Sequence, residues 1–421
     1  MINYNTLGNG LKRGLLRFSE KISKGLTKPT QRFVTDMLYG LIASGSCKLT
    51  EIGRALKEDI SLKKLVDRLG RNLAGFSEHE SIKCNYLKAV RPSLGADAML
   101  LLDASDVTKP CSKKMEAIGS VLDGSTGSFR DGYWTMGVVA LSRENDQPIP
   151  VYEKLYPCQK QGGQGFRAET KAALQSLREN FDKSNTRVFD RGFDSGDVMR
   201  ELVTHGESFI LRKNQNRVVV HKGKTMKIDD VVRGLVCTGR LQFHSKTGNV
   251  SECKIGMTQV VLPNVNHLKL NLVICKDFGD EPLVLYTNLN ESMDEIAVRV
   301  VKAYLMRWRI EEFYAFKKQG MNFEDFRVRS LNAIQTLDLL LTIAIGYIGT
   351  LCERTSEDTF ILELIVASQR VQGLNSFLKK CKFYYYAIFS GIHRVIGSLR
   401  RGISHFFQPT SPVFQLSIPG F

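Results

Sequence analysis

Apolar positions recur every three to four residues between Leu11 and Leu73, and basic residues fill many of the positions between them. This spacing is typical of short amphipathic helices that bury one face. The pattern breaks at Arg91-Pro92, because a proline disfavours helix at the residue before it. Residues 1–95 are therefore predicted to form a helical, basic DNA-binding region.

A helix-turn-helix pattern is predicted inside this region. Thr50 and Ser61 are candidate N-caps of two helices, and Asp59-Ile60 would connect them. The second helix carries basic side chains that would reach DNA phosphates or base edges in a major groove. These side chains are Lys63, Lys64 and Arg68. A solvated basic face would show the same pattern, so both interpretations stay open.

Two short apolar runs farther along the chain each end in an aspartate. Residues 98–103 read Ala-Met-Leu-Leu-Leu-Asp, and residues 187–190 read Arg-Val-Phe-Asp. Such runs suit buried strands of a sheet that is covered on both faces. Asp103 and Asp190 would then stand at the carboxyl ends of their strands, along one edge of the sheet. Residues 96–208 are predicted to form the first part of an α/β core.

The pattern changes twice after this core segment. Residues 209–290 contain β-branched runs separated by glycine and asparagine, which predicts a mainly antiparallel β insertion that interrupts the core. A capping box formed by Ser292 and Glu295 then predicts the start of a long helix.

The rest of the chain is predicted to be helical. Residues 291–352 would supply the second part of the core. Within them the apolar run Leu339–Cys352 is too short to span a bilayer, and it predicts a buried helix. Residues 353–421 are predicted to be a helical C-terminal region that contributes to dimerisation or to DNA contacts.

Four chemically active side chains share one face of the predicted long helix. At about 100° per residue their separations of three, four and seven positions place them in one narrow stripe. A charged stripe is usually a solvated helix face. In this chain the helix could also bring its carboxylate beside the two strand-end aspartates. The four residues are Tyr304, Arg307, Glu311 and Lys318.

A cluster of Asp103, Asp190 and Glu311 would point to metal chemistry. Crowded carboxylates repel one another, and divalent cations between them relieve that repulsion. Two metal ions can activate a nucleophile and stabilise the leaving oxygen of a phosphoryl transfer. Neighbouring cationic and phenolic side chains would then hold the nucleic-acid backbone in register.

Composition agrees with a nucleic-acid partner. Lys plus Arg number 59 against 43 Asp plus Glu, giving a net charge of +16 that attracts polyanions. Charge alone decides little, because some basic proteins bind no nucleic acid. The 9 cysteines form no C-x-x-C pair and are typical of reduced thiols in a cytosolic compartment. The N-terminus lacks the apolar core of a signal peptide, so no membrane association is predicted.

The sequence resembles the insertion-sequence DDE transposases that carry a Y-R-E-K signature. The spacing Tyr304-x2-Arg307-x3-Glu311-x6-Lys318 matches that signature at all four positions, and the segments around Asp103 and Asp190 look like the two aspartate motifs of the group. The resemblance covers roughly residues 30 to 350, with a β block before the glutamate helix as in the family.

This resemblance implies a bacterial cut-and-paste transposase with a ribonuclease-H-like core. Asp103, Asp190 and Glu311 would bind two Mg²⁺ or Mn²⁺ ions, and Tyr304, Arg307 and Lys318 would grip DNA near the cleaved end. Family members cleave paired terminal repeats as homodimers and then join the freed 3′-hydroxyl to target DNA. The protein would act in the bacterial cytoplasm, associated with the nucleoid.

Several points stay open at the level of sequence. Arg191 would either touch a DNA phosphate or pair with a neighbouring acid. Some relatives stack a flipped base on a tryptophan of the β insertion during hairpin formation, and residues 209–290 contain no tryptophan. The alternatives to a transposase are a nuclease with the same core and a catalytically inactive DNA-binding derivative.

Overall fold

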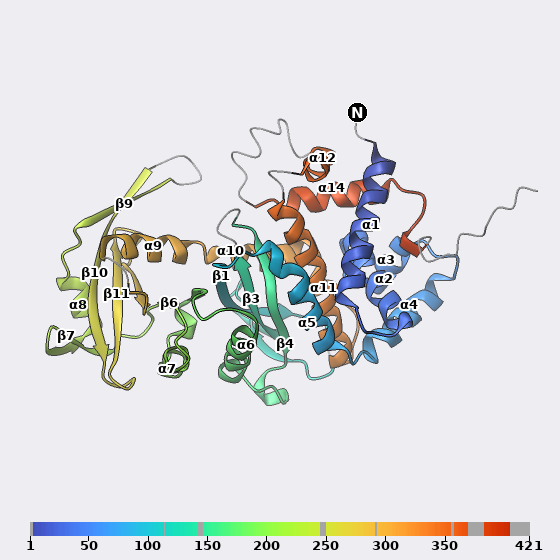
Figure 1. Cartoon of the computed structure of the whole chain (residues 1–421). Coiled ribbons are helices and arrows are strands. Elements are labelled where there is room, and N and C mark those ends of the chain that lie inside the picture. The colour runs from blue at the N-terminus through green and yellow to red at the C-terminus, as the bar shows by residue number, and fades with distance from the viewer. Residues whose placement is uncertain are drawn as a thin grey trace, which may run out of the picture.

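The computed structural model describes residues 3–112, 114–141, 146–244, 250–290, 293–354, 358–368 and 383–404. Its elements form an elongated molecule in which a helical part and a β-rich part flank a central α/β part (Figure 1). One continuous set of buried apolar side chains runs from the N-terminal helices into the sheet, so no gap in packing separates residues 1–95 from the rest of the chain.

The N-terminal region is helical, as predicted. Ser61 caps its fourth helix by accepting a hydrogen bond from the backbone N–H of Lys64. The prediction that Thr50 is an N-cap is wrong, because the third helix already begins at Leu49 and Thr50 lies in its first turn. The helices are α1 (Tyr4–Ile22), α2 (Lys28–Ser44), α3 (Leu49–Leu56), α4 (Leu62–Ala74) and α5 (His79–Val90).

A long apolar helix, α11 (Leu331–Glu353), lies at the centre of the helical part. It packs against α2, α4, α5 and the later helix α14 (Tyr385–Gly397), and α14 also packs against α12 (Thr359–Ala367). By length and apolarity α11 is the one helix among the described residues that could cross a membrane, but 89% of its most apolar window is buried within the protein. The prediction of a buried helix at Leu339–Cys352 is confirmed.

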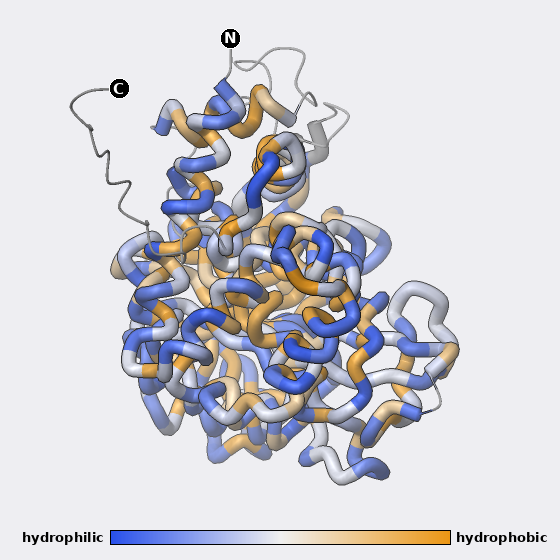
Figure 2. The backbone as a smooth tube through the Cα atoms, turned by 90° about the vertical axis from the view of Figure 1, so that its right-hand side faces the viewer, coloured by the Kyte–Doolittle hydropathy of each residue, from blue (hydrophilic) through white to orange (hydrophobic). Residues whose placement is uncertain are grey.

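Hydropathy follows this packing. Figure 2 shows hydrophilic positions along the outside of the helices that face the viewer and hydrophobic positions between them. The apolar stripes of α1 and α4 are therefore turned inward, as expected for amphipathic helices around a shared core.

The central sheet has the strand order β4-β3-β1-β5-β6. Strands β1, β5 and β6 are parallel, while β3 is antiparallel to both β1 and β4. The short β2 pairs with the first residues of β3. Helix α6 (Phe166–Asn180) packs on β3 and β4. The strands are β1 (Met99–Thr108), β2 (Gly119–Leu122), β3 (Phe129–Leu141), β4 (Pro148–Tyr156), β5 (Arg187–Phe189) and β6 (Phe209–Arg212).

The β insertion continues the same sheet. Strand β12 pairs with β6, and every strand pair from there outward is antiparallel, as predicted. Because β6 is parallel to β5, the core extends one strand beyond residue 208. The remaining elements are α7 (Gly196–Thr204), β7 (Val218–His221), β8 (Lys224–Lys227), α8 (Ile228–Gly234), β9 (Gly239–His244), β10 (Val250–Leu262), β11 (Leu268–Lys276) and β12 (Leu283–Thr287).

The single long helix predicted from Ser292 is wrong in one respect, and Ser292 itself lies outside the described residues. The chain forms α9 (Met293–Leu305), a tight turn at Met306-Arg307 and α10 (Trp308–Ala315), followed by a π-helical turn at Phe316–Gly320. At the junction the N–H of Arg307 donates to the carbonyl of Tyr304 at 2.9 Å, three residues back rather than four. This tighter hydrogen bonding separates the two helices.

Candidate active site

The sheet register brings the two aspartates level with each other. The parallel ladder between β1 and β5 ends at the pair Leu102 and Phe189, so Asp103 and Asp190 follow it side by side. Asp190 leaves the sheet there, because the next residues form a short 3-10 turn, η3 (Arg191–Phe193). The prediction that β1 ends at Asp103 is wrong, since β1 continues to Thr108 by pairing with β3.

Arg307 joins the three predicted acids. Its guanidinium donates to Asp103 Oδ2 at 3.2 Å and to Glu311 Oε1, and its Nε lies 3.9 Å from Asp190 Oδ1. The Arg307 side chain is only 13% exposed, so these contacts occur at a partly buried position. A single cation therefore offsets the mutual repulsion of three carboxylates drawn from a strand, a strand end and a helix.

Burial changes the acid–base properties of this cluster. Desolvation raises the pKa of Asp103 to about 6, although the Arg307 guanidinium and the backbone N–H of Ala104 both favour the charged form. Burial and the charge of Asp190 raise the pKa of Tyr304 to about 12. Tyr304 therefore stays neutral and acts as a hydrogen-bond donor near neutral pH.

Asp190 is held by two further side chains. The Tyr304 hydroxyl donates to Asp190 Oδ1 at 2.9 Å, and Arg212 Nη1 lies 3.9 Å from the same oxygen. Arg212 also donates to the Tyr304 hydroxyl at 3.5 Å. Arg212 was not among the site residues predicted from the sequence. The signal that identifies it is register, because Leu211 pairs with Phe189 and the next residue on β6 lies beside Asp190.

Lys318 contacts two acids other than the three predicted ones. Its ammonium donates to Asp106 Oδ2 at 3.0 Å and lies 3.8 Å from Glu324 Oε1. The π-helical turn that carries Lys318 advances by fewer degrees per residue than an α-helix. The stripe expected for an ideal helix therefore holds for Tyr304, Arg307 and Glu311, and Lys318 contacts a neighbouring acid instead.

The remaining predicted DNA contacts occupy different environments. Arg191, Lys63 and Lys64 are exposed. Arg68 instead donates to Glu58 at 2.8 and 2.9 Å and to Asp36 at 3.3 Å. Arg68 therefore forms ion pairs inside the helical region, and these contacts do not support its predicted contact with DNA.

A buried polar layer supports the site from behind. Tyr314 donates its hydroxyl hydrogen to the backbone carbonyl of Asp103 at 3.0 Å. One helical turn on, Lys317 donates to Glu153 at 2.6 Å and to Asp338 at 2.5 Å, and all three side chains are at most 2% exposed. Tyr314 therefore ties α10 to β1, and Lys317 ties the π-helical turn after α10 to β4 and α11.

The donor set suits a divalent metal, although its side chains are bridged by Arg307. Carboxylate oxygens are the ligands that Mg²⁺ and Mn²⁺ prefer. Within the part of the chain that the structure describes, no group of three or more His, Cys, Asp or Glu side chains is close enough together to hold one ion. Metal binding would therefore require Arg307 to release at least one carboxylate.

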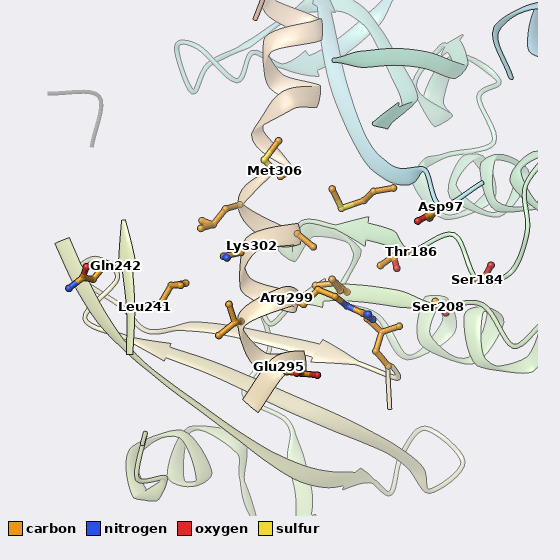
Figure 3. Close-up of a pocket in the computed structure, with 16 residues that line it drawn as sticks. Asp97, Ser184, Thr186, Ser208, Leu241, Gln242, Glu295, Arg299, Lys302 and Met306 are labelled. Carbon is orange, nitrogen blue, oxygen red and sulfur yellow. The ribbon is translucent and has the colours of Figure 1, made fainter. Parts of the chain in front are cut away.

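A large cavity lies elsewhere, between α9 and the β insertion (Figure 3). It has a volume of about 1270 Å³ and contains none of the three acids. Residues Asp97, Thr186 and Ser208 in its wall precede β1, β5 and β6, whereas Asp103 and Asp190 lie at the far ends of their shared ladder. The cavity therefore opens at the opposite edge of these strands.

Comparison with known proteins agrees with the geometry. A family model described as a transposase DDE domain matches residues 152–346, a range that contains Asp190, Arg307 and Glu311 and begins after Asp103. A cryo-EM structure of piggyBac transposase synaptic complex with hairpin DNA is similar at a TM-score of 0.42 and 11% identity, over 100% of this chain and 87% of that chain. Residues 152–346 are similar to a transposase DDE domain, and the function that this similarity supports is that of a DNA transposase, which cleaves and joins DNA with divalent metal ions.

Proposed function

We propose that Asp103, Asp190 and Glu311 are the catalytic residues of this transposase. The observation that carries the proposal is their common contact with Arg307, which gathers acids from β1, from the end of β5 and from α10 at one place. A structural ion pair needs one acid for one cation. Three acids around the partly buried Arg307 leave surplus negative charge even with Arg212 3.9 Å from Asp190, and a bound divalent cation would balance it.

We further propose that the three acids hold two Mg²⁺ or Mn²⁺ ions. When bound, such ions activate the attacking oxygen and stabilise the leaving oxygen of phosphoryl transfer. The protein's own contribution is to position the carboxylates. Tyr304 and Arg212 orient Asp190, and Tyr314 fixes the backbone of Asp103. Arg307, once released from a carboxylate, would be available to a DNA phosphate.

Further DNA contacts would come from both sides of the site. Tyr304, Arg307 and Lys318 line the helix side, and the exposed Arg191 follows Asp190 directly. Lys63 and Lys64 on α4 would contact the terminal repeat farther from the cleaved bond. Such phosphate contacts position the DNA without reading its sequence.

A ribonuclease-H-like core fits the observed strand order. In the order β4-β3-β1-β5-β6, strands β1, β3 and β4 form an antiparallel set. Strands β5 and β6 then run parallel to β1 on its other side. The Y-R-E-K spacing supports membership in the bacterial insertion-sequence group. We propose that the protein acts on the terminal repeats as a homodimer in the bacterial cytoplasm, close to the nucleoid.

A strand-transfer assay distinguishes this function from the nuclease alternative. Purified protein is incubated with Mg²⁺, a DNA duplex that carries the ends of the element, and a supercoiled target plasmid. A transposase yields target plasmid joined to the 3′ end of the duplex, whereas a nuclease yields cleaved duplex only. An inactive DNA-binding derivative yields neither product, although it retains the duplex in a gel-shift experiment.

A further inference from the structure

A second groove, lined by basic residues, adjoins the candidate active site. It has a volume of about 560 Å³ and lies between the segment that follows β1 and the segment that follows the π-helical turn. Lys109 and Lys114 come from the first segment, Arg327 and Arg329 from the second, and Lys48 from the end of the α2–α3 connection. Three distant parts of the sequence therefore supply cations to one groove.

The walls of the groove are fixed by internal hydrogen bonds. The ammonium of Lys109 donates to the carbonyl of Glu324 at 2.5 Å and to that of Phe326 at 2.7 Å, and it lies 4.2 Å from the Phe326 ring centroid. Glu116 accepts from the N–H of Leu331 at 2.7 Å, while its own N–H donates to the carbonyl of Arg329. The groove is therefore formed before any ligand binds.

Two acids, Glu324 and Asp325, also line the groove, but its five cations outnumber them. Lys114, Arg327 and Arg329 are exposed, and none of them forms an ion pair with any residue that the structure describes. Lys48, by contrast, is paired with Asp325 at 2.7 Å. Three unpaired cations around a preformed groove create a positive potential that a polyanion would neutralise.

Lys318 links the wall of the groove to the neighbourhood of the proposed catalytic acids. Glu324 accepts from the backbone N–H of Thr108 at 2.8 Å and lies 3.8 Å from the Lys318 ammonium. Lys318 in turn binds Asp106, which stands three residues after Asp103 on β1. A DNA strand that leaves the three acids past Lys318 would therefore enter the groove next.

We propose that this groove binds the sugar–phosphate backbone of the DNA beside the cleaved bond, with Lys114, Arg327 and Arg329 as its phosphate contacts. The inference rests on the proposed function, since it assumes that DNA reaches the three acids. Its chemistry is sequence-independent, because guanidinium and ammonium groups recognise phosphate rather than bases.

The test compares two variants that lose the same charge. One combines Lys114→Ala, Arg327→Ala and Arg329→Ala; the control combines Lys171→Ala, Lys183→Ala and Lys224→Ala, which are exposed and lie on other elements. The Kd for a labelled duplex that carries the element ends is measured against KCl concentration. Each lost phosphate contact lowers the slope of log K against log salt by about 0.9.

The groove variant is expected to lose roughly 2 to 3 from this slope and about tenfold in affinity at low salt, while the control keeps the wild-type values. Arg327→Gln alone should lower the slope of log K against log salt by about one. This single variant replaces the triple variant in the test if the triple variant folds poorly. Wild-type slope and affinity in a folded groove variant, alongside metal-dependent cleavage by the wild type, would refute the groove but leave the function intact. A wild type that neither binds nor cleaves the duplex would overturn both.

Discussion

Arg307 has two roles at the scale of a single residue. In the structure it neutralises part of the charge of three acids, and during catalysis it would be available to DNA. A cation that is bound by carboxylates competes with a metal for the same oxygens. In the proposed mechanism Arg307 would therefore set how readily the site accepts metal, in addition to any contact with the substrate.

The variant Arg307→Gln should separate these effects. Without the guanidinium the three acids repel, so the free energy of unfolding in EDTA should fall by about 1–2 kcal/mol at these partly buried positions. Added Mn²⁺ should raise the melting temperature of the variant more than that of the wild type. Arg54→Gln, which removes an exposed pair with Glu51, is the control and should change stability little. Equal metal responses in all three proteins would argue against the competition.

The raised pKa of Asp103 gives a pH dependence with a definite sign. Its folded-state pKa of about 6 lies above the ordinary value of 3.8, so the folded protein binds more protons between these limits and its contribution to stability falls as pH rises through that window. Metal binding requires the ionised form. Below about pH 6 the metal concentration for half-maximal cleavage should therefore rise roughly tenfold per pH unit. Titrations of Mn²⁺ at several pH values measure this, and a requirement that stays constant down to about pH 5 would contradict the assignment.

At the scale of elements, the junction between α9 and α10 determines the geometry of the site. Periodicity predicted one helix and correctly placed Tyr304, Arg307 and Glu311 near one another. It could not predict the tight turn at Met306-Arg307 or the π-helical turn, because both depend on packing against the sheet rather than on local spacing. The contact of Lys318 with Asp106 follows from that packing.

The Tyr314 hydroxyl offers a direct test of how α10 positions the acids. Tyr314→Phe removes the hydrogen bond to the Asp103 carbonyl together with the contact of the same hydroxyl with Thr135, and Tyr86→Phe removes a similar bond to the carbonyl of Pro150. Both changes should cost about 1 kcal/mol of stability. Only Tyr314→Phe should raise the metal requirement for cleavage, by several-fold and up to about tenfold. Identical metal titrations for the two variants would assign Tyr314 a structural role alone.

Gly137 lies where β3 passes between Asp103 on β1 and Glu153 on β4. A Cβ atom there would stand 2.3 Å from the Tyr314 hydroxyl oxygen and 3.0 Å from Glu153 Oε2. Gly137→Ala should therefore destabilise the protein by about 1–3 kcal/mol through overpacking. Removing the obstructing oxygen in the double variant Gly137→Ala/Tyr314→Phe should recover part of this loss. Thermal melts of the variants would count against the contact if the two losses simply added.

At the scale of the whole molecule, one core joins parts that look separate in the sequence. The basic helical region appeared to be a module that ended near Arg91-Pro92, but its helices α2, α4 and α5 cover α11 from the other end of the chain. Likewise the β insertion extends the core sheet through β12 and β6. Local periodicity identifies elements, and it contains no information about which distant element will cover an apolar face.

The three acids could be predicted from the sequence, whereas one of the residues that hold them could not. Asp103, Asp190 and Glu311 were identified from strand-end and helix spacing, and the structure brings all three to Arg307. Arg212 was not identified, because its place beside Asp190 depends on the parallel pairing of β5 and β6. That pairing is a long-range property of the sheet. The grouping of the three acids was thus more predictable than the contacts that hold them.

Metal-dependent cleavage of a supercoiled plasmid that carries the element ends tests the central claim most directly. The wild type is compared with Asp103→Asn, Asp190→Asn and Glu311→Gln, and duplex binding is measured in parallel. Each substitution removes a charge but keeps the shape, so cleavage should fall by at least about a thousandfold in every variant while DNA binding largely persists. Normal cleavage by any of the three, or wild-type cleavage in EDTA, would contradict the account.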